Sequence, residues 1–322
     1  MPPSPLYTAT RSITQASIRR RRTLLLTFDA FETLFYPNPP VPDQYAAIGH
    51  KFGVSGTTVT ADKLKAAFKD AYRVQAKRYP NYGRADVLKG QYGGPKQWWE
   101  EVIRRSFGQL LATGDSSQTG AATRDPRDIA LPSGMIETLL NRFAGDGGYT
   151  LIVLGVISNS DDRVPEVLKS LGLRVGDTRA DQDRSSMELP GFEERGSGQK
   201  SQPQDPNITY ENAQPDADLD LVITSYEAGE EKPNKLIFDV AKRQARLLAR
   251  SDAHTHGSTP AGLDEADDWT CIHIGDDYQK DYIGATAAGW QSYFLERIGG
   301  GERPVGTIRS LMDLFTELKI GS

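Results

Sequence analysis

The stretch LLLTFDAFETLF, residues 24–35, is an apolar run that leads into a carboxylate, Asp29. Short apolar runs of this kind are typical of strands buried inside a parallel sheet. Open α/β sheets bind their ligands beyond the carboxyl ends of the strands, so Asp29 is predicted to stand at that edge. It can serve there as a metal ligand, a nucleophile or both, or it can simply cap the following turn. Thr33 adds a hydroxyl four residues further on.

Two later segments have the same organisation. Residues 149–160, YTLIVLGVISNS, predict a second buried strand that ends in Ser158 and Asn159. Residues 219–233, LDLVITSYEAGEEKP, predict a third strand and a turn that leads to Lys232. The proline after Lys232 places this lysine at the start of the next helix, with its ammonium directed toward the sheet edge. The predicted helices that follow these two strands are residues 163–171 and 235–248.

A fourth segment, residues 271–281, reads CIHIGDDYQKD and predicts a strand, a glycine turn and a group of acids. Two of the acids, Asp276 and Asp281, are five residues apart around the turn. Carboxylates in this arrangement can hold a hard cation by one direct and one water-mediated contact. His273 lies within the strand itself, where a buried core residue is the favoured interpretation.

The order and spacing of the four segments resemble the haloacid dehalogenase (HAD) superfamily of aspartate-nucleophile hydrolases, over residues 23–315. In that family the four motifs are D-x-D-G-T-L/V, a strand ending in Ser or Thr, Lys before Pro, and G-D-x-x-x-x-D. The residues at these positions are Asp29, Ser158, Lys232, Asp276 and Asp281. Three stretches are also similar to the subfamily of haloacid dehalogenase-like hydrolase domain-containing protein 3: KRYPNYG at 77–83, EKPNKLIF at 231–238 and GDDYQKDYIGATAAGW at 275–290.

This resemblance implies an α/β fold, a Rossmannoid three-layer core with a parallel sheet and an inserted helical cap. It implies that Asp29 is the nucleophile, since a carboxylate attacks a phosphate dianion only when Mg²⁺ and a lysine neutralise the repulsion. The implied metal ligands are Asp29, the main-chain carbonyl of Phe31, Asp276 and Asp281. The implied catalytic partners are Lys232 and Ser158, and the implied substrate-binding residues are Thr33 and Asn159.

The same residues also have simpler interpretations. Ser158 can be a helix N-cap and Lys232 a solvated charge. Asp276 and Asp281 can be ordinary turn residues. Each simple interpretation is reasonable alone, but the four motifs together, in this order, favour a catalytic edge.

Residue 31 departs from the phosphatase pattern. Phosphatases of the family carry a second Asp two residues after the nucleophile, whereas this chain has Phe31. A phenyl ring moves no protons, and loss of a positioned general acid typically lowers a rate about 10²- to 10⁴-fold. Glu32 stands where the family has Gly, and strand alternation directs an adjacent residue to the other face of the sheet. The haloacid dehalogenases proper carry D-x-Y-G-T-L, which is closer to DAFETL, but they use no metal and lack the Gly-Asp pair found at 275–276.

Three functions remain open. The first is a slow Mg²⁺-dependent phosphohydrolase acting on a small anionic substrate. The second is a catalytically inactive binding or regulatory protein with the same fold, and the third is a 2-haloacid dehalogenase-type carbon-halogen hydrolase. The identity of the substrate does not follow from the residues, and the sequence identifies no protein partner.

The predicted domains are a basic segment at 1–22, a core formed by 23–36 and 132–322, and a helical cap at 37–131. Helices are predicted in the cap at 41–52, 60–76 and 97–111. Polar, Pro- and Gly-rich composition predicts disordered insertions at 178–218 and 250–268. Tyr79, Tyr82, Trp98 and Trp99 can line the inner face of the cap, and Arg73, Lys77 or Arg78 can meet an anionic substrate. A packed aromatic core and solvated cations are nevertheless the stronger interpretation.

Composition and charge bear on the class of protein and on the compartment in which it works. The chain has 322 residues, of which 38% are apolar, enough for a sizeable core. A net charge of −5 argues against general nucleic-acid binding, and no apolar run is long enough to predict integral membrane association. The single cysteine, Cys271, excludes an intrachain disulfide and fits a reducing compartment.

The first 28 residues are rich in Arg and Ser and contain no acid. This composition is similar to a mitochondrial transit segment, which is the predicted address. A nuclear-type basic cluster, or a plain basic arm on a cytoplasmic protein, is the alternative.

Overall fold

The structure is a computed structural model that describes residues 22–112, 151–180, 217–255, 268–297 and 304–314. Its centre is a seven-stranded sheet of order β3-β4-β2-β1-β5-β6-β7, in which every neighbouring pair is parallel. The α/β fold class with a parallel sheet is therefore confirmed. The strands are β1 (Arg22–Phe28), β2 (Leu151–Ser158), β3 (Val175–Thr178), β4 (Leu219–Thr224), β5 (Asp268–Gly275), β6 (Gln291–Leu295) and β7 (Thr307–Ile308).

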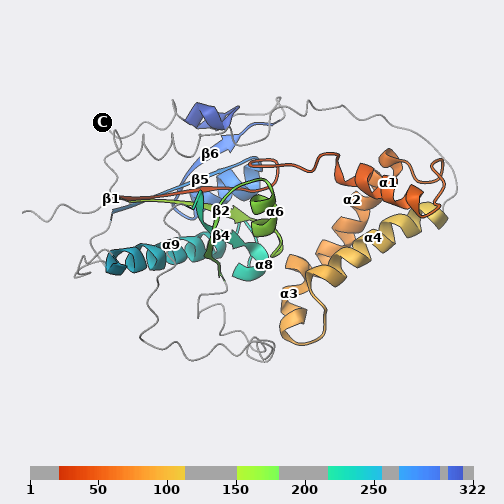
Figure 1. The fold of residues 1–322 in the computed structure, drawn as a ribbon, viewed down its shortest axis with the longest axis horizontal. Helices are drawn as coiled ribbons and strands as arrows, with labels where there is room; N and C mark the ends of the chain where they lie inside the picture. The colour runs from red at the N-terminus through yellow and green to blue at the C-terminus, as the bar shows by residue number, and fades with distance from the viewer. Residues whose placement is uncertain (1–21, 113–150, 181–216, 256–267, 298–303, 315–322) are drawn as a thin grey trace, which may run out of the picture.

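The apolar run of β1 forms a strand because both of its faces are covered. Leu24, Leu26 and Phe28 enter one hydrophobic core, and Leu25, between them, enters a second core on the opposite face. Helix α6 (Val164–Ser170) packs into the first core, and α9 (Lys235–Thr255) packs into the second. Figure 1 shows α9 along one side of the sheet. Successive side chains of a strand point to opposite faces, so a continuous apolar run fills both layers.

The connectivity of the strands marks the ligand-binding edge. Strand β1 pairs with β2 on one side and with β5 on the other. The strands that lie between them in sequence are all on the β2 side, and the chain then crosses back to form β5. Ligands bind in open α/β sheets at such a reversal of strand order, beyond the carboxyl ends of the strands. The first residues past these ends are Asp29 after β1 and Asp276 after β5.

A helical unit, residues 41–112, follows β1 and lies to one side of the sheet (Figure 1). It consists of α1 (Val41–Lys51), α2 (Ala61–Arg78), α3 (Pro80–Leu88) and α4 (Pro95–Ala112). Helix α2 begins where predicted, because the Thr60 side chain accepts a hydrogen bond from the main-chain N–H of Lys63. The sequence did not indicate α3, which contains left-handed backbone at Asn81, Tyr82 and Gly83.

The aromatic residues of the helical unit form its core. Trp98 is 2% exposed and Tyr82 is 7% exposed, and both belong to a buried cluster against which Tyr79 and Trp99 pack. Arg73, Lys77 and Arg78 are exposed. The aromatic residues therefore form a packed core, and the three cations lie at the surface.

Some residues at the ends of the two predicted disordered insertions belong to the folded core. Helix α9 continues to Thr255, beyond its predicted end at Leu248, so the first residues of the 250–268 segment are helical. Thr178 is the last residue of β3, and Ala180 is fully buried in the second core. Most of both segments, and residues 1–21 of the basic segment, lie outside the described residues. Cys271 and His273 are buried, as predicted.

The remaining short elements are α8 (Ser225–Ala228), the π-helical turn η2 (Tyr278–Ile283), α10 (Gly284–Ala287) and the 3₁₀ turn η3 (Leu311–Asp313). No helix in the described part of the chain is long and apolar enough to cross a lipid bilayer.

Candidate active site

Asp29 is the first residue past β1, and a hydrogen bond to the neighbouring strand holds it there. Its main-chain N–H donates to the carbonyl of Ile274 in β5, at 2.8 Å. The chain then folds into a tight loop, because the amides of Leu34 and Phe35 both donate to the carbonyl of Ala30. The Asp29 side chain is thereby fixed between β1 and β5, and the residue is only 9% exposed.

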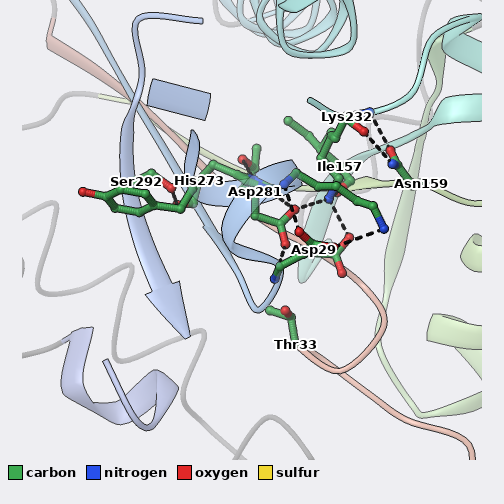
Figure 2. A network of polar contacts seen from close by, with 12 residues as sticks. Asp29, Thr33, Ile157, Asn159, Lys232, His273, Asp281 and Ser292 are labelled. Atoms are coloured by element: carbon green, nitrogen blue, oxygen red, sulfur yellow. Dashed lines mark hydrogen bonds and ion pairs between the residues drawn. The ribbon is translucent and has the colours of Figure 1, made fainter. Parts of the chain in front are cut away.

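Lys232 reaches this carboxylate from the loop after β4. Its Nζ donates to Asp29 Oδ1 at 2.6 Å, to Asp281 Oδ1 at 2.6 Å and to the carbonyl of Ile157 at 2.7 Å (Figure 2). An ammonium group has three donors, so all three are used. The residue is 3% exposed, which excludes a solvated charge. Its position differs from the prediction in one respect, since α9 begins at Lys235 and Lys232 precedes the helix.

Asn159 fixes the backbone of Lys232. Its Nδ2 donates to the Lys232 carbonyl at 2.8 Å, and its Oδ1 accepts from the Lys232 amide at 2.7 Å (Figure 2). Both polar groups of this side chain are thus bound to Lys232. Asn159 was predicted to bind substrate, but the structure gives its side chain the task of holding the lysine loop.

Asp281 anchors the lysine from the other side. Its Oδ2 accepts from the amide of Asp277 at 3.0 Å, and its Oδ1 lies 3.3 Å from Nε2 of His273. A Cβ atom at Gly275 would lie 2.2 Å from Asp281, so only glycine fits at the turn before the acids. Burial by itself raises the pKa of Asp281, but the nearby ammonium of Lys232 and the hydrogen bond from His273 hold that pKa well below its usual range.

His273 is a structural residue of this network. Its Nδ1 lies 2.9 Å from the hydroxyl of Thr27, and burial lowers the pKa of the ring to about 4. The ring is therefore neutral near pH 7. A neutral ring with its proton on Nε2 donates to Asp281 and accepts from Thr27.

Asp276 is held at the same edge by Thr33, whose hydroxyl donates to Asp276 Oδ1 at 3.3 Å. Oxygen atoms of Asp29, Asp276 and Asp281 all lie within 4.8 Å of one another. Burial and the charge of Asp281 raise the pKa of Asp276 to about 6. Burial raises the pKa of Asp29 to about 7, although Lys232 opposes this. Three carboxylates thus lie together with one ammonium, which bonds to Asp29 and Asp281 but not to Asp276, and the deficit of positive charge fits a divalent cation.

Ser158 ends β2, the strand beside β1, and is buried there in register with Thr224 of β4. It directly follows Ile157, whose carbonyl accepts from Lys232. The four predicted motifs therefore meet at one edge of the sheet, as their order implied.

Phe31 lies in the loop beyond β1, and its side chain is 40% exposed. Its ring packs edge-on against Phe35, with centroids 4.8 Å apart. Strand β1 ends at Phe28, so the alternation of an extended strand does not continue to residues 31 and 32. Glu32 has a left-handed backbone with φ of 59°, which corrects the prediction that it simply points to the opposite face of a strand.

Arg297 holds the same loop and was not predicted. Its Nε donates to the carbonyl of Glu32 at 2.6 Å, and its Nη2 donates to the carbonyl of Thr33 at 2.9 Å. No local pattern in the sequence marks this arginine, because its partners are more than 250 residues away.

The helical unit is tied to the sheet next to the second motif. Trp99 Nε1 donates to Asp161 Oδ2 at 2.8 Å, and Arg163 forms an ion pair with the same carboxylate. Asn81 donates to the carbonyl of Ser225 at 2.8 Å, and the guanidinium of Arg84 donates to the carbonyl of Tyr226. The left-handed turn in α3 thus carries residues that bind α8.

Curated relatives found by sequence include a protein named for the family that the motifs resemble. No protein-family model matches the chain. The protein YMR130W of Saccharomyces cerevisiae is 26% identical over 87% of this chain and 74% of that protein. Haloacid dehalogenase-like hydrolase domain-containing protein 3 of Bos taurus is 27% identical over 86% of this chain and 83% of that protein. Among solved structures, a HAD phosphatase from Thermococcus onnurineus aligns over 93% of this chain and 98% of that chain, with 16% identity and a TM-score of 0.40.

Proposed function

We propose that the chain is a haloacid dehalogenase-like hydrolase that hydrolyses small phosphate esters slowly, with Asp29 as the nucleophile. One observation carries the proposal. Asp29 lies within 4.8 Å of two further carboxylates at the ligand-binding edge, and the Nζ atom of Lys232 is 2.6 Å from it. A buried carboxylate with one oxygen fixed by an ammonium is oriented to attack with the other.

Asp29 and Asp276 would hold Mg²⁺, with the main-chain carbonyl of Phe31 as the further ligand that the family resemblance implies. Both oxygens of Asp281 already accept hydrogen bonds from the chain, so its main task would be to hold Lys232. When bound, the ion would neutralise the phosphoryl oxygens and so reduce their repulsion of the attacking carboxylate.

The chain's own residues supply the remaining steps. An oxygen of Asp29 attacks the phosphorus, the bond to the ester oxygen breaks, and the phosphoryl group remains on Asp29. The departing oxygen takes a proton from solvent water, because residue 31 is Phe. Water then attacks the phosphorus and loses a proton to solvent, and the bond between the phosphorus and the Asp29 oxygen breaks, which releases inorganic phosphate and restores the Asp29 carboxylate. Lys232 and the hydroxyl of Ser158 would stabilise the charge on the phosphoryl group.

A catalytically inactive binding protein is the second candidate, and Phe31 favours it. Its ring packs on Phe35, and no proton donor stands at this position. Such a protein would keep the metal site and the affinity for a phosphorylated ligand without turnover.

The test is release of phosphate from an aryl phosphate, with and without millimolar Mg²⁺, in the natural protein and in Asp29→Asn. We expect slow, Mg²⁺-dependent release that Asp29→Asn abolishes. A parallel assay measures release of halide from a 2-haloacid. Halide release would identify the protein as a carbon-halogen hydrolase, the third function predicted from the sequence. Mg²⁺ binding without turnover of either substrate would replace the proposal by the inactive candidate.

A further inference from the structure

A hollow of about 370 Å³ opens on the surface of the helical unit, away from the residues of the candidate active site. We call it the arginine pocket. It is formed by the last turn of α2, the residue after it and the middle of α4, two helices that lie side by side (Figure 1). Its lining residues are Arg78, Tyr79, Glu101, Arg104 and Arg105.

The arginine pocket has an excess of positive charge. None of its three arginines forms an ion pair with any residue in the part of the chain that the structure describes. Its one acid, Glu101, is occupied in another way. The Glu101 carboxylate accepts from Gln75 at 2.5 Å, from Tyr92 at 3.1 Å and from Gln97 at 2.8 Å. Three guanidinium groups and one carboxylate therefore line the cavity, which leaves an excess of positive charge.

Arg105 shows this most directly. Its Nε atom is buried and has no hydrogen-bond partner. Buried donors are almost always satisfied, by the protein, by water or by a ligand, so this N–H of Arg105 is a donor that an acceptor in the pocket can use.

An aromatic stack contributes to the wall of the pocket. The Tyr79 ring stacks on Tyr92 with centroids 4.1 Å apart, and the guanidinium carbon of Arg78 lies 5.2 Å from the centre of the Tyr79 ring. A guanidinium held on an aromatic face keeps its edge free for hydrogen bonds with an anion.

The arginine pocket faces away from the catalytic edge. Trp99 on α4 points to the sheet domain, since its ring nitrogen donates to Asp161. At 3.6 residues per turn, Glu101, Arg104 and Arg105 are separated from Trp99 by about 120° to 160° around the helix. A ligand in the arginine pocket would therefore not be the group that reacts with Asp29.

We propose that the arginine pocket binds a phosphate group, either as inorganic phosphate or on a small phosphate monoester. Planar guanidinium groups match phosphate oxygens with paired hydrogen bonds, and a dianion balances the excess charge. The volume exceeds that of phosphate alone, so there is room for a small organic group attached to it. The site is independent of the proposed hydrolysis.

The experiment is calorimetric titration of the full chain with inorganic phosphate and, separately, with glycerol 3-phosphate, in metal-free buffer and in an Asp29→Asn background. Metal-free buffer disfavours an anion beside the carboxylates of the catalytic edge, and Asp29→Asn prevents hydrolysis of the ester. Arg104→Gln and Arg105→Gln remove lining charges. The matched control is Arg73→Gln, which removes the same charge from an exposed position on α2 that pairs with Asp70 and does not line the pocket.

We expect saturable binding that Arg104→Gln and Arg105→Gln each weaken by about 10-fold or more, and that Arg73→Gln leaves within about twofold. The probe with the lower dissociation constant identifies the source of the phosphate group. Absence of saturable binding in the parent protein overturns the proposal, as does an equal loss in all three variants. If Arg105→Gln fails to fold, Arg104→Gln decides, because Arg104 is exposed.

Discussion

The catalytic edge has an excess of negative charge, whereas the arginine pocket has an excess of positive charge. At the edge, three carboxylates lie together with one ammonium, that of Lys232, whereas in the pocket three guanidinium groups lie with one acid, Glu101. The edge is buried and assembled from segments far apart in sequence, so its charges interact strongly. The pocket is open and formed by neighbouring helices, and solvent screens two of its three arginines. A missing counter-ion should therefore affect folding at the edge and only ligand binding in the pocket.

The largest expected effect is from Lys232→Met. This change leaves Asp29 and Asp281 buried without their cation, and breaking a buried ion pair in this way costs about 3 to 5 kcal/mol of unfolding free energy. The measurement is urea denaturation in metal-free buffer. The control is Lys235→Met, three residues on, whose exposed pair with Asp239 should be worth at most about 0.5 kcal/mol. Similar losses in the two variants would contradict the view that the edge depends on Lys232.

The contrast between the regions also explains what the sequence could predict. Asp29, Ser158, Lys232 and Asp276 each follow a recognisable strand, and parallel strands bring their carboxyl ends to one edge whatever the connections between them. Their convergence was therefore predictable from order alone. The sequence predicts substrate binding by Asn159 because it shows that this residue follows a strand. It does not show that the backbone of Lys232 lies beside the Asn159 side chain. Only the fold brings the Lys232 backbone to its side chain.

Other features depend on contacts that leave no local trace. Arg297 was missed because its acceptors are main-chain carbonyls, which any residue supplies. Helix α3 was missed because its left-handed backbone at Asn81 and Tyr82 requires tertiary contacts, such as the hydrogen bond from Asn81 to Ser225. The extent of the loop after β1 was also hidden, since the apolar pattern continues through Phe31 although the strand ends at Phe28.

The next effect in size concerns the missing acid. Phe31→Asp should raise hydrolysis of an alkyl phosphate about 10²-fold, the lower end of general-acid effects, because this leaving group needs a proton. The gain with an aryl phosphate should be smaller. Phe31→Asn is the matched control, because asparagine has nearly the same shape as aspartate but no acidic proton. Circular dichroism must first show that each variant is folded, since the change removes the contact with Phe35. A folded Phe31→Asp protein that binds Mg²⁺ but gains no activity would favour the inactive candidate.

Binding of Mg²⁺ tests the charge deficit at the edge directly. A ligand that binds only the folded state at ten times its Kd stabilises it by about 1.4 kcal/mol, so Mg²⁺ should raise the unfolding temperature by a few degrees. Asp276→Asn should remove most of this increase. The adjacent Asp277→Asn is the control, because Asp277 caps η2 and pairs with Lys280 outside the cluster. An equal Mg²⁺ response in the two variants would place the ion elsewhere.

The smallest expected effect comes from a comparison of two neighbouring tryptophans on α4, Trp98 and Trp99. Trp99→Phe removes the donor to Asp161, and Trp98→Phe removes a donor to the Tyr79 carbonyl within the helical unit. Each loses one hydrogen bond, so each should lower the unfolding free energy by about 1 kcal/mol. Only the first bond joins the helical unit to the segment after β2. Trp99→Phe should therefore also speed amide hydrogen exchange around Asp161 and Arg163, whereas Trp98→Phe should not. Equal exchange in the two variants would mean that Trp99 packs against the sheet domain without holding it.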